Sequence, residues 1–260
     1  MTFRRVEVQG HFGEWLQGRM GPAGPVALVT VRCPAHTVRA PAPGPALFEA
    51  DRLGAFARAL GLPSGLPSAD CNFPAGAGGG ASTATLVAIA RAAGFAGCPE
   101  ALARACLAIE GASDPLMFPD PDRLLWASRE ARVLRTLPAP PRCTILGGFW
   151  GPPLRTDPLD PTFPDVSDLV AAWELAVTRR DLLDAAQVAG ESARRCTGLR
   201  GPLDPTADLA RDLGALGWLR AHTGSARGLV YRPGAVSANA ADTLREAGFA
   251  GVLTFETGAE

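Results

Sequence analysis

The sequence predicts an α+β fold, in which strands and helices are grouped rather than strictly alternating. Hydrophobic residues make up 47% of the 260 positions, which is enough for a sizeable core. Short segments with the two-residue alternation of strands are interrupted by pairs of consecutive segments with helical spacing. This arrangement does not fit a doubly wound parallel sheet, in which each strand is followed by a helix, and it favours the α+β class.

The N-terminal part is expected to begin with strands. Residues 4–8 alternate like a short strand and lead into a glycine-punctuated loop at 10–18, which carries His11, Glu14 and Gln17. Further strands are predicted at 27–31, 36–39, 124–126, 132–137 and 143–148, and helices at 51–60, 86–93 and 99–109.

A proline-rich stretch at 152–164 interrupts this pattern, and we place a boundary near residue 155. The predicted halves are therefore residues 1–155 and 156–260. In the second half, helices are predicted at 166–178, 181–196, 206–213 and 237–246. A second loop of glycine and hydroxyl residues enters a strand within 221–231, and a last strand is predicted at 252–255.

Composition excludes several classes of function. The 25 basic and 26 acidic residues give a net charge of -1, so there is no electrostatic footprint for nucleic acid or for an anionic membrane. The six cysteines form no C-x-x-C motif and only three histidines are present, so no zinc pattern is found. The N-terminus lacks the apolar core of a signal peptide. We expect a cytoplasmic protein with a small-molecule substrate, and a homodimer is compatible with the sequence.

The most informative stretch is the glycine-rich run within residues 72–85, which precedes the predicted helix at 86–93. Glycine allows a backbone to approach a ligand closely, and the N–H groups at the start of a helix have no partner within the helix. Such a loop therefore favours an anion such as phosphate. The predicted phosphate-binding residues are Gly76, Ala77, Gly78, Gly79, Gly80, Ala81, Ser82 and Thr83.

Two common nucleotide-binding motifs do not account for this run. A Walker A loop requires a lysine, and this chain has none, since all 25 basic residues are arginine. A dinucleotide-binding fingerprint requires a preceding strand, but residues 68–73 are too short and polar for a good one. A flexible turn before a helix is the ordinary alternative.

The run from Pro74 resembles the second signature of the GHMP kinases, the superfamily of galactokinase, homoserine kinase, mevalonate kinase and phosphomevalonate kinase. That signature reads roughly P-x-x-x-G-L-G-S-S-A, and Pro74, Gly78, Gly80 and Ser82 fall in register with it. A glycine replaces the leucine and an alanine replaces the first serine.

Three further elements of that superfamily stand in the matching order. Gly13 and Glu14 are similar to the N-terminal Gly-Glu signature, and the segment 222–225 is similar to the third, glycine-rich signature. Glu110 and Asp114 occupy the acidic segment in which the family places a Mg²⁺-binding glutamate and, in several members, an aspartate base. The resemblance implies a two-lobed fold, with an N-terminal ATP-binding half that contains a left-handed βαβ-type element and a ferredoxin-like C-terminal half.

Within the superfamily, the sequence most resembles the L-threonine kinases of cobalamin biosynthesis. Their motifs G-E-x-x-Q-G and A-H-S-G-S/T are similar to residues 13–18 and 221–225. Their glycine loop and acidic segment also have counterparts here. Two departures stand out, because the loop lysine is replaced by Ala77 and the aspartate that closes the loop by Thr85.

This resemblance implies an ATP- and Mg²⁺-dependent kinase that converts L-threonine into O-phospho-L-threonine for the aminopropanol arm of cobalamin. Ser82 and Glu110 would hold Mg²⁺, and Asp114 would orient or deprotonate the acceptor hydroxyl. Arg227 is the nearest candidate for positive charge at the γ-phosphate. The expected substrate-binding residues are Glu14, which is available for a substrate ammonium, Gln17, His222, Thr223, Gly224 and Ser225.

Two alternatives remain open at this point. Ala77 and Thr85 are compatible with a catalytically weak or inactive nucleotide-binding protein of the same fold, a pseudokinase, although Glu110 and Asp114 are retained. A kinase for another acceptor, such as homoserine, is the second alternative. The candidate residues also have ordinary explanations, since an acid at a helix end or before a proline is common in turns.

Overall fold

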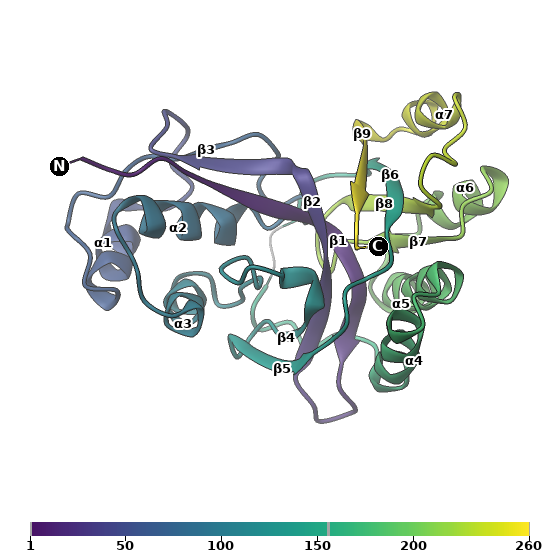
Figure 1. The fold of residues 1–260 in the computed structure, drawn as a ribbon, viewed down its shortest axis with the longest axis horizontal. Helices are drawn as coiled ribbons and strands as arrows, with labels where there is room; N and C mark the ends of the chain where they lie inside the picture. Colours follow the sequence, from purple (N-terminus) through teal and green to yellow (C-terminus); the bar gives the residue numbers. More distant parts are fainter. Residues whose placement is uncertain (1, 155–156, 260) are drawn as a thin grey trace.

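The computed structural model describes residues 2–154 and 157–259 and confirms the α+β class (Figure 1). The described strands form one antiparallel sheet in the order β5-β4-β2-β1-β7-β8-β6-β9, with the short β3 paired to β2. The strands are β1 (Val6–Arg19), β2 (Val26–Ala40), β3 (Asp70–Cys71), β4 (Leu124–Ala127), β5 (Arg132–Thr136), β6 (Cys143–Phe149), β7 (Gly217–Arg220), β8 (Ala226–Tyr231) and β9 (Ala250–Thr257). The helices are α1 (Ala50–Ala59), α2 (Ala81–Ala92), α3 (Pro99–Glu110), α4 (Ser167–Thr178), α5 (Leu182–Arg200), α6 (Thr206–Asp212) and α7 (Ala240–Glu246), with one 3₁₀ turn at Pro121–Arg123.

One long strand, β1, replaces the short strand and loop predicted near the N-terminus. Residues 10–18 are all buried within β1 and pair with β2. The pairing register shifts between His11 and Glu14 and again before Leu16, and such irregularities re-aim side chains along a strand. Gly13, with φ +68°, fits this irregular backbone, so the glycines that suggested a loop belong to a bent strand.

Helix α2 lies at the centre of the N-terminal part. It packs against β1 and β2, and most of its residues are buried, which explains why its sequence is small and apolar all round. Figure 1 shows α1, α2 and α3 on one side of the long β1–β2 pair and α4 to α7 on the other. The core is divided in the same way, with one buried cluster around α2 and another around α4 and α5.

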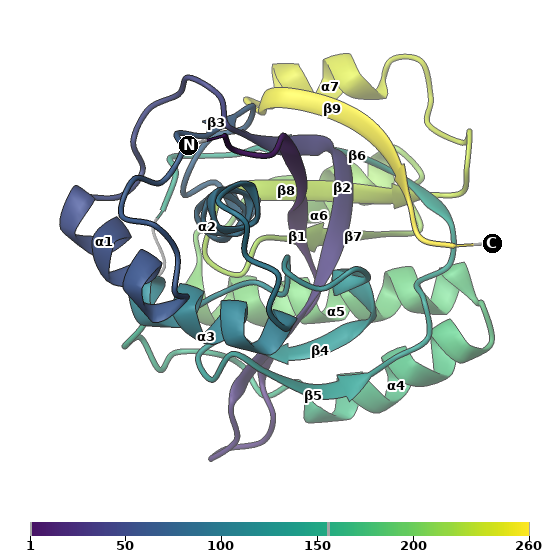
Figure 2. The same cartoon turned by 60° about the vertical axis from the view of Figure 1, so that its left-hand side comes forward.

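From β6 onward the chain follows the ferredoxin-like order of strand, helix, strand, strand, helix and strand. Helices α4, α5 and α6 connect β6 to β7, and α7 connects β8 to β9. In space these strands lie in the order β7-β8-β6-β9 (Figure 2). Helix α5 packs against both β1 and β7, and this contact links the ferredoxin-like part to the long N-terminal strand.

The predicted boundary between residues 155 and 156 lies outside the described residues. Strand β6 precedes that boundary in sequence and pairs with β8 and β9, which follow it. Within the part of the chain that the structure describes, no helix is both long and apolar enough to cross a bilayer.

Candidate active site

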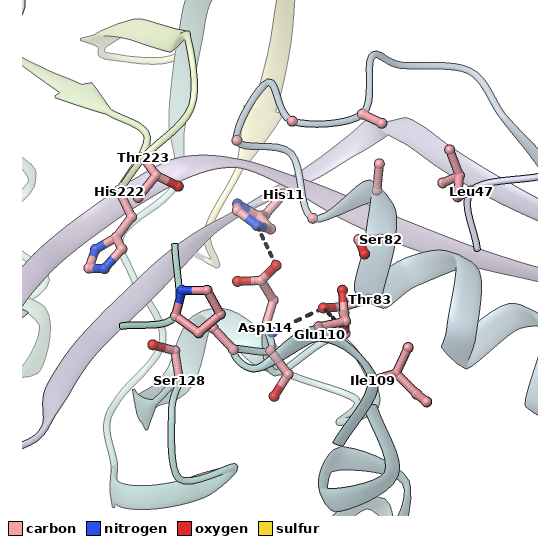
Figure 3. Close-up of a pocket in the computed structure, with 18 of the residues that line it drawn as sticks. His11, Leu47, Ser82, Thr83, Ile109, Glu110, Asp114, Ser128, His222 and Thr223 are labelled. Carbon is pink, nitrogen blue, oxygen red and sulfur yellow. Dashed lines mark hydrogen bonds and ion pairs between the residues drawn. The ribbon is translucent and has the colours of Figure 1, made fainter. Parts of the chain in front are cut away.

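A cavity of about 420 Å³ opens where the glycine loop, β1 and the end of α3 meet. The segment that leads into α1 and the turn between β7 and β8 also contribute to its lining. In Figure 3, His222 and Thr223 lie at one end, Leu47 and Ile109 at the other, and Asp114 between them. The cavity therefore brings together residues from all four sequence elements that carry the kinase resemblance.

The glycine loop, residues 75–80, directs its carbonyl groups away from the cavity. The carbonyls of residues 76 to 80 each accept a backbone hydrogen bond, from Leu154, Ala226, Gly13, His11 and Ala84 in turn. The N–H groups of residues 76 to 83 have no acceptor among the described residues. Because α2 begins at Ala81, these donors stand at the positive end of a helix, which is a suitable site for an anion.

Glycine is required at two positions in this loop. Gly78 has φ +85°, and a Cβ on it would lie 2.2 Å from the Cβ of Ala221. Gly80 has φ +73°, and a Cβ there would lie 2.6 Å from Cδ2 of His11. Across the gap, a Cβ on Gly224 would lie 2.2 Å from the nitrogen of Gly78. The glycine loop and the turn between β7 and β8 are therefore packed backbone to backbone.

Thr83 joins the two acidic residues of the predicted acidic segment. Its Oγ1 donates to Oε2 of Glu110 at 2.9 Å and accepts from the N–H of Asp114 at 3.2 Å. Burial raises the pKa of Glu110 to about 8, against the effect of hydrogen bonds from Ser82 and Thr83. A buried carboxyl with a raised pKa is stabilised by any cation that enters the cavity.

His11 is paired with Asp114 in the middle of the cavity. Its Nε2 lies 3.3 Å from Oδ2 of Asp114, and its Nδ1 lies 3.3 Å from the carbonyl of Gly13 (Figure 3). Burial alone would lower the pKa of His11, but Asp114 and Glu14 raise it to about 9. The imidazole is therefore a cation at neutral pH and fixes the position of the Asp114 carboxylate.

The end of the cavity near His222 contains polar atoms without partners. Oε2 of Glu14 and Nδ1 of His222 are buried and have no hydrogen-bond partner among the described residues. Burial raises the pKa of Glu14 to about 8 and lowers that of His222 to about 3. The His222 ring stacks on Phe163 at 4.2 Å, which holds it in place. Unpaired buried polar groups are costly, and their presence at a cavity indicates a polar ligand.

Metal-binding groups are sparse in the described residues. No cluster of three or more His, Cys, Asp or Glu side chains there could hold a metal ion alone. Glu110 with its hydrogen-bonded neighbour Ser82 instead provides one carboxylate and one hydroxyl beside an anion site. This set of oxygen donors fits Mg²⁺, which commonly binds one or two carboxylates together with phosphates and waters.

Several predicted site residues lie elsewhere. Gln17 is buried near the end of β1 and does not line the cavity, and its side-chain amide donates to the carbonyl of Arg220. Gly224 packs against the glycine loop, and Ser225 is buried with its carbonyl bonded to Trp150. The remaining predicted substrate-binding residues, Glu14, His222 and Thr223, line the cavity.

The predicted phosphate-binding residues divide in a similar way. Six of them line the cavity, namely Gly76, Gly78, Gly80, Ala81, Ser82 and Thr83. Ala77 and Gly79 alternate with them in the loop and are buried on its side away from the cavity. Thr85 is buried within α2 and does not line the cavity. Arg227 is also turned away, since its guanidinium is buried against Asp204.

Sequence reasoning gave no role to two residues that line the cavity, His11 and Arg52. His11 stood out only as a polar residue near Glu14, and its partner Asp114 is distant in sequence. Arg52 carries no sequence signal beyond a position in a predicted helix. Its Nη2 donates to the carbonyl of Ile109, which brings the first turn of α1 to the end of α3.

No protein-family model and no curated protein matches the sequence. Solved structures do. Mevalonate kinase from methicillin-resistant Staphylococcus aureus is 15% identical, with 98% of this chain and 100% of that chain covered and a TM-score of 0.60. A putative homoserine kinase from Listeria monocytogenes is 18% identical, with 97% and 94% covered and a TM-score of 0.59. Phosphomevalonate kinase from Streptococcus pneumoniae is 12% identical, with both chains fully covered and a TM-score of 0.60.

These likenesses extend over nearly the whole of each chain. At 12–18% identity they establish the fold alone, and the chain has the fold of these small-molecule kinases. The GHMP kinase-like fold predicted from the motifs is thereby confirmed.

Proposed function

We propose that the protein is an ATP-dependent kinase that transfers the γ-phosphate to the hydroxyl of L-threonine. The product, O-phospho-L-threonine, would enter the aminopropanol arm of cobalamin synthesis. The observation that carries the proposal is that the N–H groups of residues 76 to 83 have no acceptor among the described residues, and that six of these residues line one cavity with Glu110 and Asp114. Phosphoryl transfer needs such positioning and charge neutralisation more than covalent catalysis.

In this proposal the glycine loop binds the phosphates of ATP at the start of α2. Glu110 and Ser82 hold Mg²⁺, which when bound neutralises charge on the phosphates. Thr83 keeps the Glu110 carboxyl in place and fixes the backbone of Asp114 through the two hydrogen bonds described above.

Asp114 receives the hydroxyl of the acceptor. A threonine hydroxyl is a weak acid, so the carboxylate contributes mainly by orienting the oxygen toward the γ-phosphate and by accepting its proton as transfer proceeds. His11 positions the Asp114 carboxylate through the 3.3 Å contact. Its charge also offsets part of the negative charge that gathers between Asp114 and the phosphates.

Glu14 is the proposed partner of the substrate ammonium. Its carboxyl is buried at the acceptor end, has one oxygen without a partner among the described residues, and accepts a hydrogen bond from the backbone N–H of His222. An ammonium group would satisfy that oxygen and return the carboxyl to its ionised form. This observation favours an amino-acid alcohol over an acceptor without an amine.

Homoserine is the second candidate acceptor, because it carries the same ammonium and one of the structures with this fold is a putative homoserine kinase. A pseudokinase is a third reading, motivated by Ala77 and Thr85. The side chains of Ala77 and Thr85 do not line the cavity, and Glu110 and Asp114, which do, are retained.

The test is ADP release by purified protein with Mg·ATP and a panel of L-threonine, L-serine, L-homoserine and mevalonate, with Asp114→Asn alongside. The proposal predicts release with L-threonine that the Asp114 variant loses. Release with L-homoserine instead would establish the second candidate. No release with any acceptor, while ATP still raises the melting temperature, would establish the pseudokinase.

A further inference from the structure

The cavity contains a cation that the proposed mechanism does not use. Arg52 is the one arginine lining the cavity among those that the structure describes, and it stands in the first turn of α1. Its side chain is exposed, and the only hydrogen bond recorded for it within the described residues joins Nη2 to the carbonyl of Ile109. That single bond fixes the guanidinium beside the end of α3 and leaves its other N–H groups available to a ligand.

The other positive groups nearby are already committed. His11 is held by Asp114, and Arg227 is buried in an ion pair with Asp204 in which Nε lies 2.6 Å from Oδ2. The chain has no lysine, and the position aligned with the lysine of the related loop is the buried Ala77. Among the described residues, Arg52 is therefore the one arginine of the cavity lining that a nucleotide polyphosphate would meet.

Arg52 lies toward the end of the cavity that is opposite His222, where the proposed function places the nucleotide. Ile109, to which it is bonded, lies at the end opposite His222 (Figure 3). Ile109 is also the residue before Glu110, whose side chain is hydrogen-bonded to Ser82 and Thr83 at the start of α2. The charge of Arg52 acts on Glu110, and the guanidinium is thus within electrostatic range of the anion site.

We propose that Arg52 binds the polyphosphate of the nucleotide from its position beside the end of α3. The inference rests on the proposed kinase function and adds to it a residue for nucleotide recognition. A guanidinium presents a planar fork of donors that suits phosphate oxygens, and its charge persists at every physiological pH. In a chain without lysine, an arginine from α1 takes over the charge that the related loop supplies from within.

The test is nucleotide binding measured by calorimetry for the full-length wild type and for Arg52→Gln, Arg52→Lys and Arg58→Gln. Arg58 is an exposed arginine in the last turn of the same helix and does not line the cavity, so its variant is the matched control. The ligands are Mg·ATP, Mg·ADP and adenosine, each at low and at high KCl, and thermal unfolding checks that all four proteins are folded.

The expected result is that Arg52→Gln weakens Mg·ATP and Mg·ADP binding about tenfold or more, the loss of one charge-assisted contact, and leaves adenosine binding unchanged. Arg52→Lys should retain part of the affinity, Arg58→Gln all of it, and the salt dependence of ATP binding should be smaller in Arg52→Gln. Equal ATP affinity in Arg52→Gln and wild type would overturn the inference and leave the kinase proposal standing. An equal loss for adenosine would overturn the phosphate contact, and a wild type that binds no nucleotide would overturn both proposals.

Discussion

Glu14 and Asp204 are two carboxyls with almost the same burial and opposite electrostatic outcomes. Their side chains are 3% and 2% exposed. Burial would raise the pKa of Asp204, but Arg227 at 2.6 Å and a hydrogen bond from the backbone N–H of Thr206 hold it below its usual value. Glu14 has no contact of that kind. Its ion-pair contact among the described residues is the longer one to Nδ1 of His11 at 3.8 Å, its Oε2 has no hydrogen-bond partner there, and its pKa rises to about 8.

The comparison assigns Asp204 a structural role and Glu14 a role in ligand binding. The Asp204–Arg227 pair is complete, and Arg227 also donates to the carbonyls of Gly224 and Ala226, so the pair supports the turn between β7 and β8 from behind. Glu14, which lines the cavity, instead has one oxygen without a hydrogen-bond partner among the described residues. Substitutions in the Asp204–Arg227 pair should therefore lower the stability of the protein, and substitutions of the carboxyls that line the cavity should lower its activity.

The largest effect is expected for Asp204→Asn. Removing the charge of Asp204 leaves Arg227 buried without a counter-ion, and breaking such a pair costs about 3–5 kcal/mol of unfolding free energy. Urea unfolding followed by fluorescence measures this loss. The matched control is Asp208→Asn in α6, an exposed partner of Arg211 that should change stability by less than about 0.5 kcal/mol. A stable Asp204→Asn variant would remove the distinction between the two carboxyls.

Asp114→Asn is expected to reduce activity more than stability. Loss of the carboxylate that orients the acceptor should lower kcat by about 10²–10⁴-fold, the range of general acid–base groups. Asp114→Asn also removes the counter-charge of His11, but this imidazole can lose its proton, so the loss of stability should be smaller than in Asp204→Asn. Steady-state kinetics and urea unfolding of the same preparation check both statements. A variant with normal kcat would exclude Asp114 from the reaction.

Glu14→Gln should stabilise the ligand-free protein and weaken the binding of the acceptor. Below pH 4.5 the carboxyl is protonated in both folded and unfolded protein, and between 4.5 and about 8 only the unfolded protein ionises it, so its presence lowers stability as the pH rises. The variant should therefore be more stable than wild type by about 1–3 kcal/mol at pH 8 and nearly equal at pH 4.5.

The kinetic side of the same variant is a rise in the acceptor KM. In the wild type, that KM should fall as the pH rises toward 8, because the ionised carboxyl binds ammonium better, and this dependence should be absent in Glu14→Gln. A pH profile of KM at saturating Mg·ATP measures it. A variant that is less stable than wild type at pH 8 would contradict the account of Glu14.

The smallest effect is expected for Thr83→Val, which keeps the shape of the side chain. The loss of the hydrogen bonds to Glu110 and from Asp114 should lower kcat about fivefold to tenfold, the effect of about 1 kcal/mol. Thr85→Val in the same helix is the control, because Oγ1 of Thr85 has no hydrogen-bond partner in the described structure. Equal kcat values for the two variants would assign Thr83 no part in positioning the acids.

The fold class and the order of the site elements could be predicted from sequence because they depend on local signals. Glycines before an apolar helix and acids at the end of the next helix are visible in the chain itself. The contacts between these elements could not be predicted, since His11 meets Asp114 and Arg52 meets Ile109 only through the tertiary fold.

The misplaced residues have equally specific causes. Residues 10–18 were predicted as a loop because of their glycines, and the loop would have exposed Glu14 and Gln17 alike. In β1 a register shift separates Glu14 from Leu16, so simple alternation does not place the two side chains. Glu14 lines the cavity, whereas the amide of Gln17 is bonded to the carbonyl of Arg220. Gly224 and Ser225 belong to a turn that contacts the glycine loop through its backbone, and only its first residues reach the cavity.

The most direct test of the account compares two acceptors that differ only in the amine, L-threonine and 3-hydroxybutanoate, by Mg·ATP-dependent ADP release in wild type and in Glu14→Gln. We predict that the wild type prefers L-threonine by at least about 100-fold in kcat/KM, as expected where a buried polar group is left unpaired by the smaller substrate, and that Glu14→Gln loses most of this preference. Equal use of both acceptors by the wild type, or an unchanged preference in Glu14→Gln, would contradict the claim that the unpaired carboxyl of Glu14 awaits the substrate ammonium.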